Sequence, residues 1–128
     1  KLSPIYDRSI IMSILASILE VMRNDNLLIT VTFTTVTGAI VNITGSTCFF
    51  TVKVANTDTD VNAKISKTWN VHSDPVNGIT TFSLVPADTA TLLGKYFYDI
   101  QIKTAGGLIY TPIHGIFRVI ADTTLRIV

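Results

Sequence analysis

The stretch that decides the fold is residues 93–102, LGKYFYDIQI, in which a glycine is followed by regularly alternating side chains. Successive side chains of a β-strand point to opposite faces, so each face appears at every second residue. One face is apolar or aromatic throughout, with Tyr96, Tyr98, Ile100 and Ile102. The other face, which continues to Lys103, is more polar, with Phe97, Asp99, Gln101 and Lys103. This alternation predicts a strand with one buried face and one mostly solvated face.

The residues before this strand predict a tight crossing between two sheets. Residues 86–93, PADTATLL, resemble a single helical turn, because Pro86 can occupy the first helical position and Gly94 can end the turn. A tyrosine that opens the next strand is typical of the tyrosine corner of β-sandwiches, in which its hydroxyl group bonds to upstream backbone. Tyr96 is therefore interpreted as a structural residue and not as a binding residue.

The overall composition indicates one folded domain with a surface that is poor in charge. The chain has 128 residues, of which 48% are hydrophobic and 15% charged, so it can bury a core and is not disordered. The low charged fraction suggests that part of the surface faces another protein. A formal net charge of +1 gives no electrostatic basis for binding nucleic acid or an acidic membrane.

Cys48 is the single cysteine, so the chain cannot form an internal disulfide. It lies beside Phe49 and Phe50, and a cysteine in an apolar run is expected to be a buried, unreactive thiol. Secreted immunoglobulin domains usually carry a paired cysteine framework. The single thiol therefore favours assembly in a reducing cytoplasm.

The N-terminal segment has a helical pattern. Between residues 7 and 23, apolar residues recur at steps of four and three, and their arc covers roughly 200° of a helical wheel, against the ~100° of a single core contact. We expect an α-helix that packs on its own domain, on copies of itself, or on both, because so wide an arc has to be covered on two sides. The expected assembly residues are Ile11, Leu15, Ile18 and Met22.

Two other interpretations of this segment fit its residues less well. A signal peptide would place Lys1 and Arg8 before the apolar run, but no small-x-small cleavage site follows, and Glu20 interrupts the run. A transmembrane helix needs about 20 apolar residues, and this run is too short. The spacing also fits a coiled-coil seam of about two heptads, so a homo-oligomer is the expectation.

After Asn24-Asp25-Asn26 the hydrophobic period changes from helical to alternating. Residues 27–34, LLITVTFT, place apolar residues on one face and threonines on the other, as in a half-buried antiparallel strand. Further strands are expected at residues 40–45, 47–54, 65–71, 79–84, 108–111 and 115–120. We therefore expect a mainly β fold, an immunoglobulin-like antiparallel β-sandwich over residues 27–128, preceded by an N-terminal α-helix within residues 1–26.

No arrangement of residues in the sequence predicts catalysis, a metal site or a cofactor. His72 and His114 have no histidine, cysteine or glutamate at metal-ligand spacing. Residues 56–62, NTDTDVN, alternate oxygen ligands like a calcium loop, but Val61 stands where that loop needs glycine and Lys67 where it needs glutamate. The sequence contains no Gly-x-Ser-x-Gly elbow and no glycine-rich phosphate loop. We expect a protein that is not an enzyme.

Several turns and core positions together resemble a known family. They are residues 77–84, NGITTFSL; residues 86–89, PADT; residues 93–100, LGKYFYDI; Gly106-Gly107 before Tyr110-Thr111; and residues 115–119, GIFRV, before residues 122–124, DTT. With the strands from residue 27 onward, they resemble the immunoglobulin-like N-terminal domain of phage upper baseplate proteins and related domains of other phage virion proteins. The resemblance covers residues 27–124. It implies an immunoglobulin-like fold, a virion context and no enzymatic activity.

The sequence thus predicts a non-enzymatic structural component of a phage virion that is assembled in the host cytoplasm. Other virion proteins and copies of the chain itself are the expected partners, bound through the immunoglobulin-like domain and the N-terminal helix; nucleic acid and membranes are not. In the resembled family the domain continues into a stalk, whereas here an apolar helix precedes it, so baseplate, tail, neck and capsid accessory positions all stay open. The alternative is a carbohydrate- or receptor-binding module that uses the sandwich loops.

Overall fold

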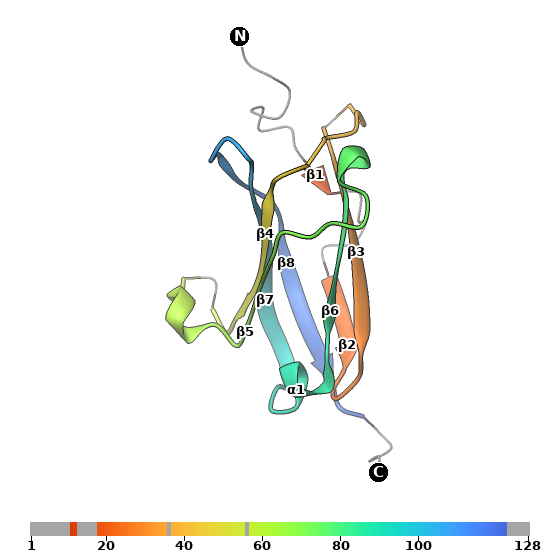
Figure 1. The fold of residues 1–128 in the computed structure, drawn as a ribbon. Coiled ribbons are helices and arrows are strands. Elements are labelled where there is room, and N and C mark those ends of the chain that lie inside the picture. Colours follow the sequence, from red (N-terminus) through yellow and green to blue (C-terminus); the bar gives the residue numbers. More distant parts are fainter. Residues whose placement is uncertain (1–10, 13–17, 36, 56, 123–128) are drawn as a thin grey trace.

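The computed structural model describes residues 11–12, 18–35, 37–55 and 57–122, and these residues form two β-sheets packed face to face (Figure 1). The smaller sheet has the strand order β1-β3-β6, with β1 Ile11–Met12, β3 Leu27–Thr34 and β6 Ile79–Leu84. The larger sheet has the order β2-β8-β7-β4-β5, with β2 Ile18–Met22, β8 Ile109–Ile120, β7 Gly94–Lys103, β4 Thr47–Lys53 and β5 Ile65–Trp69. The chain is mainly β and forms a β-sandwich, as expected.

The core between the sheets is centred on Phe50 of β4, which is completely buried. Its ring centroid lies 4.8 Å from that of Phe82 in the opposite sheet, 5.8 Å from that of Tyr98 and 5.9 Å from that of Phe117. Trp69 stacks on Phe82 with 4.6 Å between the centroids. Tilted and offset aromatic pairs of this kind add to the hydrophobic gain of burial, so the cluster joins the two sheets.

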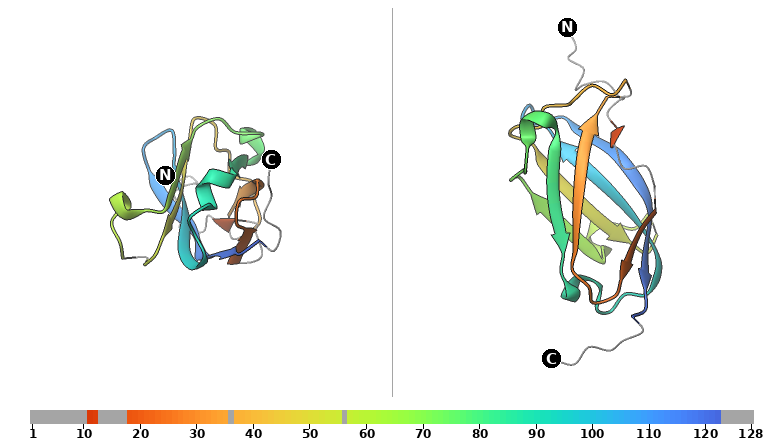
Figure 2. Two further views of the ribbon diagram at one scale, coloured as in Figure 1. Left: turned by 90° about the horizontal axis from the view of Figure 1, so that it is seen from below. Right: turned by 90° about the vertical axis from the view of Figure 1, so that its right-hand side faces the viewer.

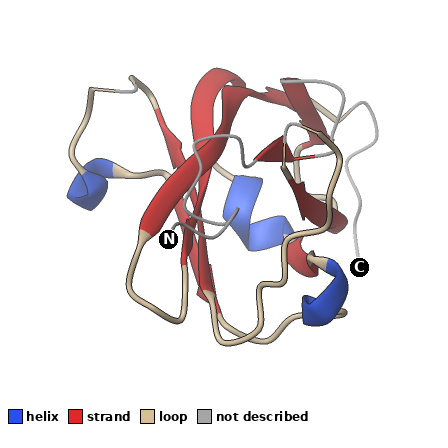
Figure 3. Ribbon diagram, turned by 90° about the horizontal axis from the view of Figure 1, so that it is seen from above, coloured by secondary structure: helices blue, strands red, loops and turns tan. Residues whose placement is uncertain are grey.

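The helical turns that the structure describes are short and lie in the connections between strands (Figure 3). They are the 3-10 turns η2 Asp60–Asn62 and η3 Pro75–Asn77, and α1 Pro86–Thr89. As predicted, α1 joins β6 to β7, and Gly94 follows with a positive φ of 92°. The hydroxyl oxygen of Tyr96 accepts a hydrogen bond from the backbone N–H of Leu93 at 3.1 Å. The predicted upstream bond of the tyrosine corner is therefore confirmed.

Tyr96→Phe should lower stability and Tyr98→Phe should not, although the two tyrosines lie on the same strand. Tyr96→Phe removes the bond to Leu93 and should lower the free energy of unfolding by about 1 kcal/mol. The Tyr98 hydroxyl is buried without a hydrogen-bond partner among the described residues, so Tyr98→Phe should leave stability unchanged or increase it. Urea unfolding of the two variants compares them, and an equal loss in both would contradict the assignment.

The predicted strand boundaries agree with the structure in the centre of the chain and differ near its end. β3 and β6 occupy residues 27–34 and 79–84 as expected, whereas residues 40–45 contribute only an isolated bridge between Thr34 and Ile40. The two strands expected between residues 108 and 120 are one strand, β8. Its register with β7 shifts between Ile100 and Ile102, so Thr111-Pro112 lies opposite Gln101. This β-bulge accommodates a proline, which has no N–H group for the ladder.

The predicted N-terminal helix is wrong for the residues that the structure describes. β1 pairs antiparallel with β3, and β2 pairs in parallel with β8, beside which it lies in Figure 2 (right). Pairing with β8 satisfies the backbone of β2, and the β-branched Ile18 and Val21 favour a strand. The boundary at residue 26 is wrong as well, because β2 is an edge strand of the sandwich. Residues 1–10 and 13–17 lie outside the described residues.

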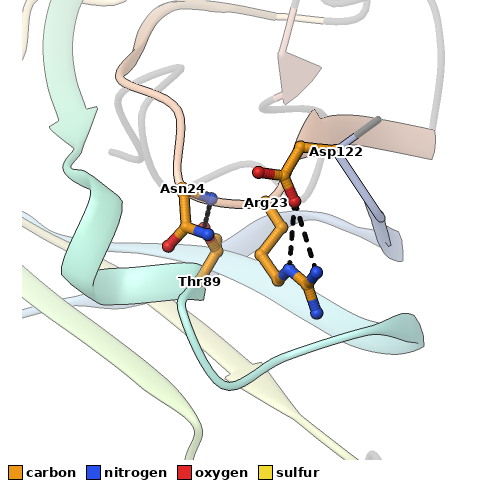
Figure 4. Close-up of polar contacts among 4 residues, drawn as sticks. All are labelled: Arg23, Asn24, Thr89 and Asp122. Atoms are coloured by element: carbon orange, nitrogen blue, oxygen red, sulfur yellow. Dashed lines mark hydrogen bonds and ion pairs between the residues drawn. The ribbon is translucent and has the colours of Figure 1, made fainter. Parts of the chain in front are cut away.

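The segment after β2 is tied to the C-terminal end of β8 and to α1 (Figure 4). The guanidinium group of Arg23 donates to the Asp122 carboxylate, with Nε and Nη2 each 3.3 Å from Oδ1. The backbone N–H of Arg23 donates to the carbonyl of Ile120 at 2.8 Å. The backbone N–H of Asn24 donates to the buried hydroxyl of Thr89 in α1 at 3.0 Å. These contacts hold β2 against β8, so the side chains of β2 have a defined position on the sheet.

Candidate functional site

The outer face of the larger sheet carries an apolar stripe where β2 lies beside β8. The parallel register places Ile18 opposite Ile116 and Met22 opposite Ile120. Ile18, Met22 and Ile120 are 42%, 38% and 37% exposed, and Ile116 is half-buried. These four residues form the β2–β8 stripe. Leu19 and Val21 point toward the core, and Ile18 and Met22 flank Glu20 on the outer face, so four of the five residues of β2 are apolar. This composition hides the alternation that would have marked β2 as a strand.

The structure brings together two of the four predicted assembly residues. Ile18 and Met22 share the outer face of β2, as they would have shared one face of a helix. Ile11 lies in β1 of the other sheet, opposite Thr34, and Leu15 lies outside the described residues. Sequence reasoning missed Ile116 and Ile120, although their alternation with buried residues of β8 was a usable signal.

An ion pair crosses the middle of the β2–β8 stripe. The guanidinium Nη1 of Arg118 lies 3.0 Å from the Glu20 carboxylate, and both side chains are about half exposed, at 42% and 51%. Exposed pairs of this kind contribute roughly 0–1 kcal/mol to stability. The pair therefore neutralises the centre of the stripe more than it stabilises the fold.

A polar groove of about 240 Å³ lies on the same outer face, further along the sheet over β5, β4 and β7. Register places Thr51 opposite Asp99 and Phe49 opposite Gln101. The groove is lined by Phe49, Thr51, Lys53, Asp60, Ser66, Asp99 and Gln101. Its residues come from three strands and the β4–β5 loop, so neighbouring positions in the sequence do not reveal it.

The lysine of the groove is already engaged. The ammonium group of Lys53 lies 2.8 Å from the Asp60 carboxylate and donates to the backbone carbonyl of Asp58 at 2.9 Å. Asp99, in contrast, receives no hydrogen bond or ion pair at its carboxylate from the residues that the structure describes. Burial raises the pKa of Asp99; the charge of Lys53 opposes this increase, Asp60 adds to it, and His114 opposes it. The groove thus contains a half-buried carboxylate that the fold does not use.

Asp99→Asn should increase stability at neutral pH by an amount that depends on pH. Because the pKa is raised on folding, the native state holds the Asp99 proton more tightly, and wild-type stability falls as pH rises from the ordinary value of 3.8 through the folded pKa. The advantage of Asp99→Asn should therefore be small at acid pH, grow through that window and stay constant above it. Chemical denaturation across the pH range measures it, and an advantage that does not vary with pH would contradict this account.

A second, more apolar hollow of about 180 Å³ lies between the groove and the β2–β8 stripe. It is lined by Phe97, Tyr98, His114, Gly115 and Ile116. Lys95 lies over the ring of Phe97, with its ammonium nitrogen 5.3 Å from the centroid. His114 lies opposite Asp99 in the register, so the hollow and the groove meet at this pair.

His72, which lies away from the groove, has a structural role. His72 Nε2 lies 2.8 Å from the carbonyl oxygen of Ser46, and its Nδ1 lies 2.8 Å from the hydroxyl of Thr80, which also accepts from Trp69 Nε1 at 2.7 Å. Both ring nitrogens are engaged. Among the described residues no group of three or more histidine, cysteine, aspartate or glutamate side chains could hold a metal ion. Cys48 is buried, and burial raises the pKa of its thiol to about 12, as the sequence led us to expect of an unreactive cysteine.

Comparison with known proteins supports the fold and leaves the function open. No family model and no curated protein matches the chain. Among solved structures, the fold is similar to that of CopC from Methylosinus trichosporium OB3b, with 11% sequence identity and a TM-score of 0.51. The match covers 91% of this chain and 99% of CopC. No helix within the described residues is both long and apolar enough to cross a membrane.

Proposed function

We propose that this chain is a non-enzymatic structural component of a phage virion, which assembles in the host cytoplasm through an immunoglobulin-like domain. The observation that carries the proposal is the β2–β8 stripe, an exposed apolar surface on an edge strand that is fixed to the sandwich. Exposed apolar side chains that gather on one face can mark a protein–protein contact. Here the Ile18/Ile116 and Met22/Ile120 pairs lie on either side of the Glu20–Arg118 ion pair. The turns and core positions that resemble phage virion domains supply the biological context.

The strand order supports the immunoglobulin-like assignment. β3, β4, β5, β6, β7 and β8 correspond to strands B, C, C′, E, F and G of the immunoglobulin fold, because β8-β7-β4-β5 reproduces the order G-F-C-C′ and β3 pairs with β6 as B pairs with E. Tyr96 occupies the tyrosine-corner position near the start of strand F. Cys48 lies on strand C and has no partner cysteine in the sequence, so this domain does not depend on an oxidising compartment.

The assembly interface of this proposal consists of Ile18 and Met22, with Ile116 and Ile120 beside them. A second copy of the chain, or another virion protein, would bury these side chains. Each large apolar side chain contributes about 1.5–3 kcal/mol when it becomes fully buried, before the costs of association. Repeated copies in a symmetric particle multiply such contacts through avidity.

Substitution of both exposed β2 residues tests the proposal. Phage particles that encode Ile18→Asp and Met22→Asp together should incorporate at most about one tenth of the wild-type amount of the protein, because the two charges cannot be buried in the contact. Leu28→Asp is the matched control, since Leu28 is 69% exposed on the outer face of the smaller sheet. Quantitative mass spectrometry of purified particles gives the amounts. Absence of the wild-type chain from particles would overturn the virion assignment, and normal incorporation of the double variant would overturn the interface.

The mass of the purified chain in solution separates self-assembly from binding to other proteins. Sedimentation velocity over a range of concentrations should show a homo-oligomer that the double variant converts to a monomer. A wild-type chain that stays monomeric at every concentration would contradict self-assembly and restrict the interface to another virion protein.

A further inference from the structure

We propose that the polar groove over β5, β4 and β7 binds a neutral saccharide, with one sugar ring on Phe49 and its hydroxyl groups bonded to Asp99 and Gln101. This inference does not depend on the virion proposal, and it concerns a sheet face and not the sandwich loops. The groove is separate from the β2–β8 stripe, so one molecule can use both.

The polar groups of the groove are available and chemically mixed. The side chains of Thr51, Ser66, Asp99 and Gln101 form no hydrogen bond with the residues that the structure describes. Together they offer an acceptor-only carboxylate, an amide that both donates and accepts, and two hydroxyl groups. A sugar ring presents hydroxyl groups that can donate and accept in the same way. Thr51, Asp99 and Gln101 are half-buried and Ser66 is exposed. Half-buried polar groups without partners lose part of their hydration, and a ligand that supplies the missing bonds recovers the loss.

The aromatic group of the groove is also available. Phe49 is half-buried on the outer face, and its ring makes no contact with another aromatic ring among the described residues. The core aromatic cluster is built instead from its neighbour Phe50 and other residues. Phe49 lies directly opposite Gln101, so an apolar ring face and a polar amide stand next to each other at one end of the groove. Binding sites for small molecules combine apolar walls with a few placed polar groups in this way.

The charges of the groove favour an uncharged ligand. Lys53 already pairs with Asp60, so its charge is not available to an anion, and Asp99 would repel one. A basic side chain could pair with Asp99, but it would approach the ammonium group of Lys53 and leave Gln101 and the hydroxyl groups unused. The volume of about 240 Å³ lies below the roughly 300–1,000 Å³ of sites for drug-sized ligands, which suits a single ring in an open groove.

The proposal makes a specific prediction about Asp99, because this residue should lower stability and contribute to binding. The carboxylate is unfavourable in the unliganded fold, since burial favours its neutral form. Residues that reduce stability while remaining exposed to a groove are typical of binding sites, where function and stability compete. One substitution, Asp99→Asn, should therefore raise the melting temperature and weaken saccharide binding at the same time.

The test is an array of neutral and acidic oligosaccharides probed with the full chain, followed by calorimetric titration of the best neutral ligand. Asp99→Asn and Phe49→Leu should each weaken binding by about tenfold or more, since each removes one principal contact. Asp25→Asn, the same change at an exposed residue in the β2–β3 turn, should bind within about twofold of wild type, a free-energy difference well below that of one hydrogen bond. Melting curves of all variants distinguish a variant that has lost its fold from one that has lost only its binding.

Several outcomes would overturn the proposal. They are the absence of any neutral ligand on the array, a preference for acidic glycans, and neutral binding that Asp99→Asn leaves intact. Titration with an oligolysine peptide tests the alternative that the groove binds a basic side chain. Tight peptide binding that is lost in Asp99→Asn would assign the groove to a basic side chain of a partner and not to a saccharide.

Discussion

Gly78→Ala should destabilise the protein by about 3–5 kcal/mol, the largest effect that we expect from a single added methyl group. Gly78 follows η3 with a φ of 74°, a conformation that costs a residue with a Cβ atom about 1–3 kcal/mol. An added Cβ would lie 2.6 Å from the carbonyl oxygen of Val41 and 2.7 Å from that of Phe33. Both obstacles are backbone atoms, so no side-chain rotation relieves them, and overpacking adds about 1–3 kcal/mol.

The cost is high because Gly78 lies where three segments meet. Its carbonyl oxygen accepts the backbone N–H of Phe33 at 2.8 Å, and the carbonyl of Phe33 accepts the N–H of Val41 at 3.2 Å. A shift of Gly78 away from the clash would lengthen the bond to β3. The added methyl group must therefore displace the β3 end of the smaller sheet or unfold the turn.

Gly107→Ala provides the matched control for this prediction. Gly107 has a φ of 93°, and an added Cβ would meet nothing within 4 Å. The control carries the backbone strain without the clash, so it should lose only about 1–2 kcal/mol. Urea unfolding followed by Trp69 fluorescence measures both variants. Equal losses would show that the approach to Val41 and Phe33 has no energetic consequence.

Thr80→Val should destabilise the protein by about 2–4 kcal/mol, although valine has nearly the same shape as threonine. Thr80 is completely buried at the centre of a chain of hydrogen bonds. The Ser46 carbonyl can only accept, so His72 carries its proton on Nε2 and accepts from the Thr80 hydroxyl at Nδ1. The same hydroxyl oxygen accepts from Trp69 Nε1. Valine leaves the imidazole nitrogen and the indole N–H without partners, at about 1–3 kcal/mol each when buried, less where they reach water.

Two comparisons isolate this hydrogen-bond chain. Thr80→Ser keeps the hydroxyl group and loses one methyl, so it should cost only about 1 kcal/mol. Thr30→Val makes the same change at an exposed position of β3 and should be nearly neutral. Nitrogen-15 NMR of the imidazole should show an Nε2–H tautomer in the wild type. A protonated Nδ1 would contradict the proposed direction of the chain.

Local sequence patterns were sufficient to predict the strands that have one solvent-exposed face and one buried face. β3 and β7 alternate regularly, so their faces could be assigned from side-chain type alone, and burial follows the predicted faces. The bond of Tyr96 to Leu93 was also predictable, because both residues belong to one turn of the chain. Ile18 and Met22 were chosen as interface candidates from an excess of apolar side chains. The structure places both exposed on a strand and not on a helix, and their role in a contact stays a prediction.

The amino-acid sequence by itself determined that this chain is a β-sandwich with a tyrosine corner and a single buried thiol, since alternation, turn residues and composition are local properties. Tertiary structure decided the rest. β2 is a strand because its backbone pairs in parallel with β8, which lies about 100 residues later in the sequence. The periodicity of a local segment cannot reveal so distant a partner. The groove exists because Phe49, Ser66 and Asp99 meet across three strands, and only pairing in register sets which side chains share a face.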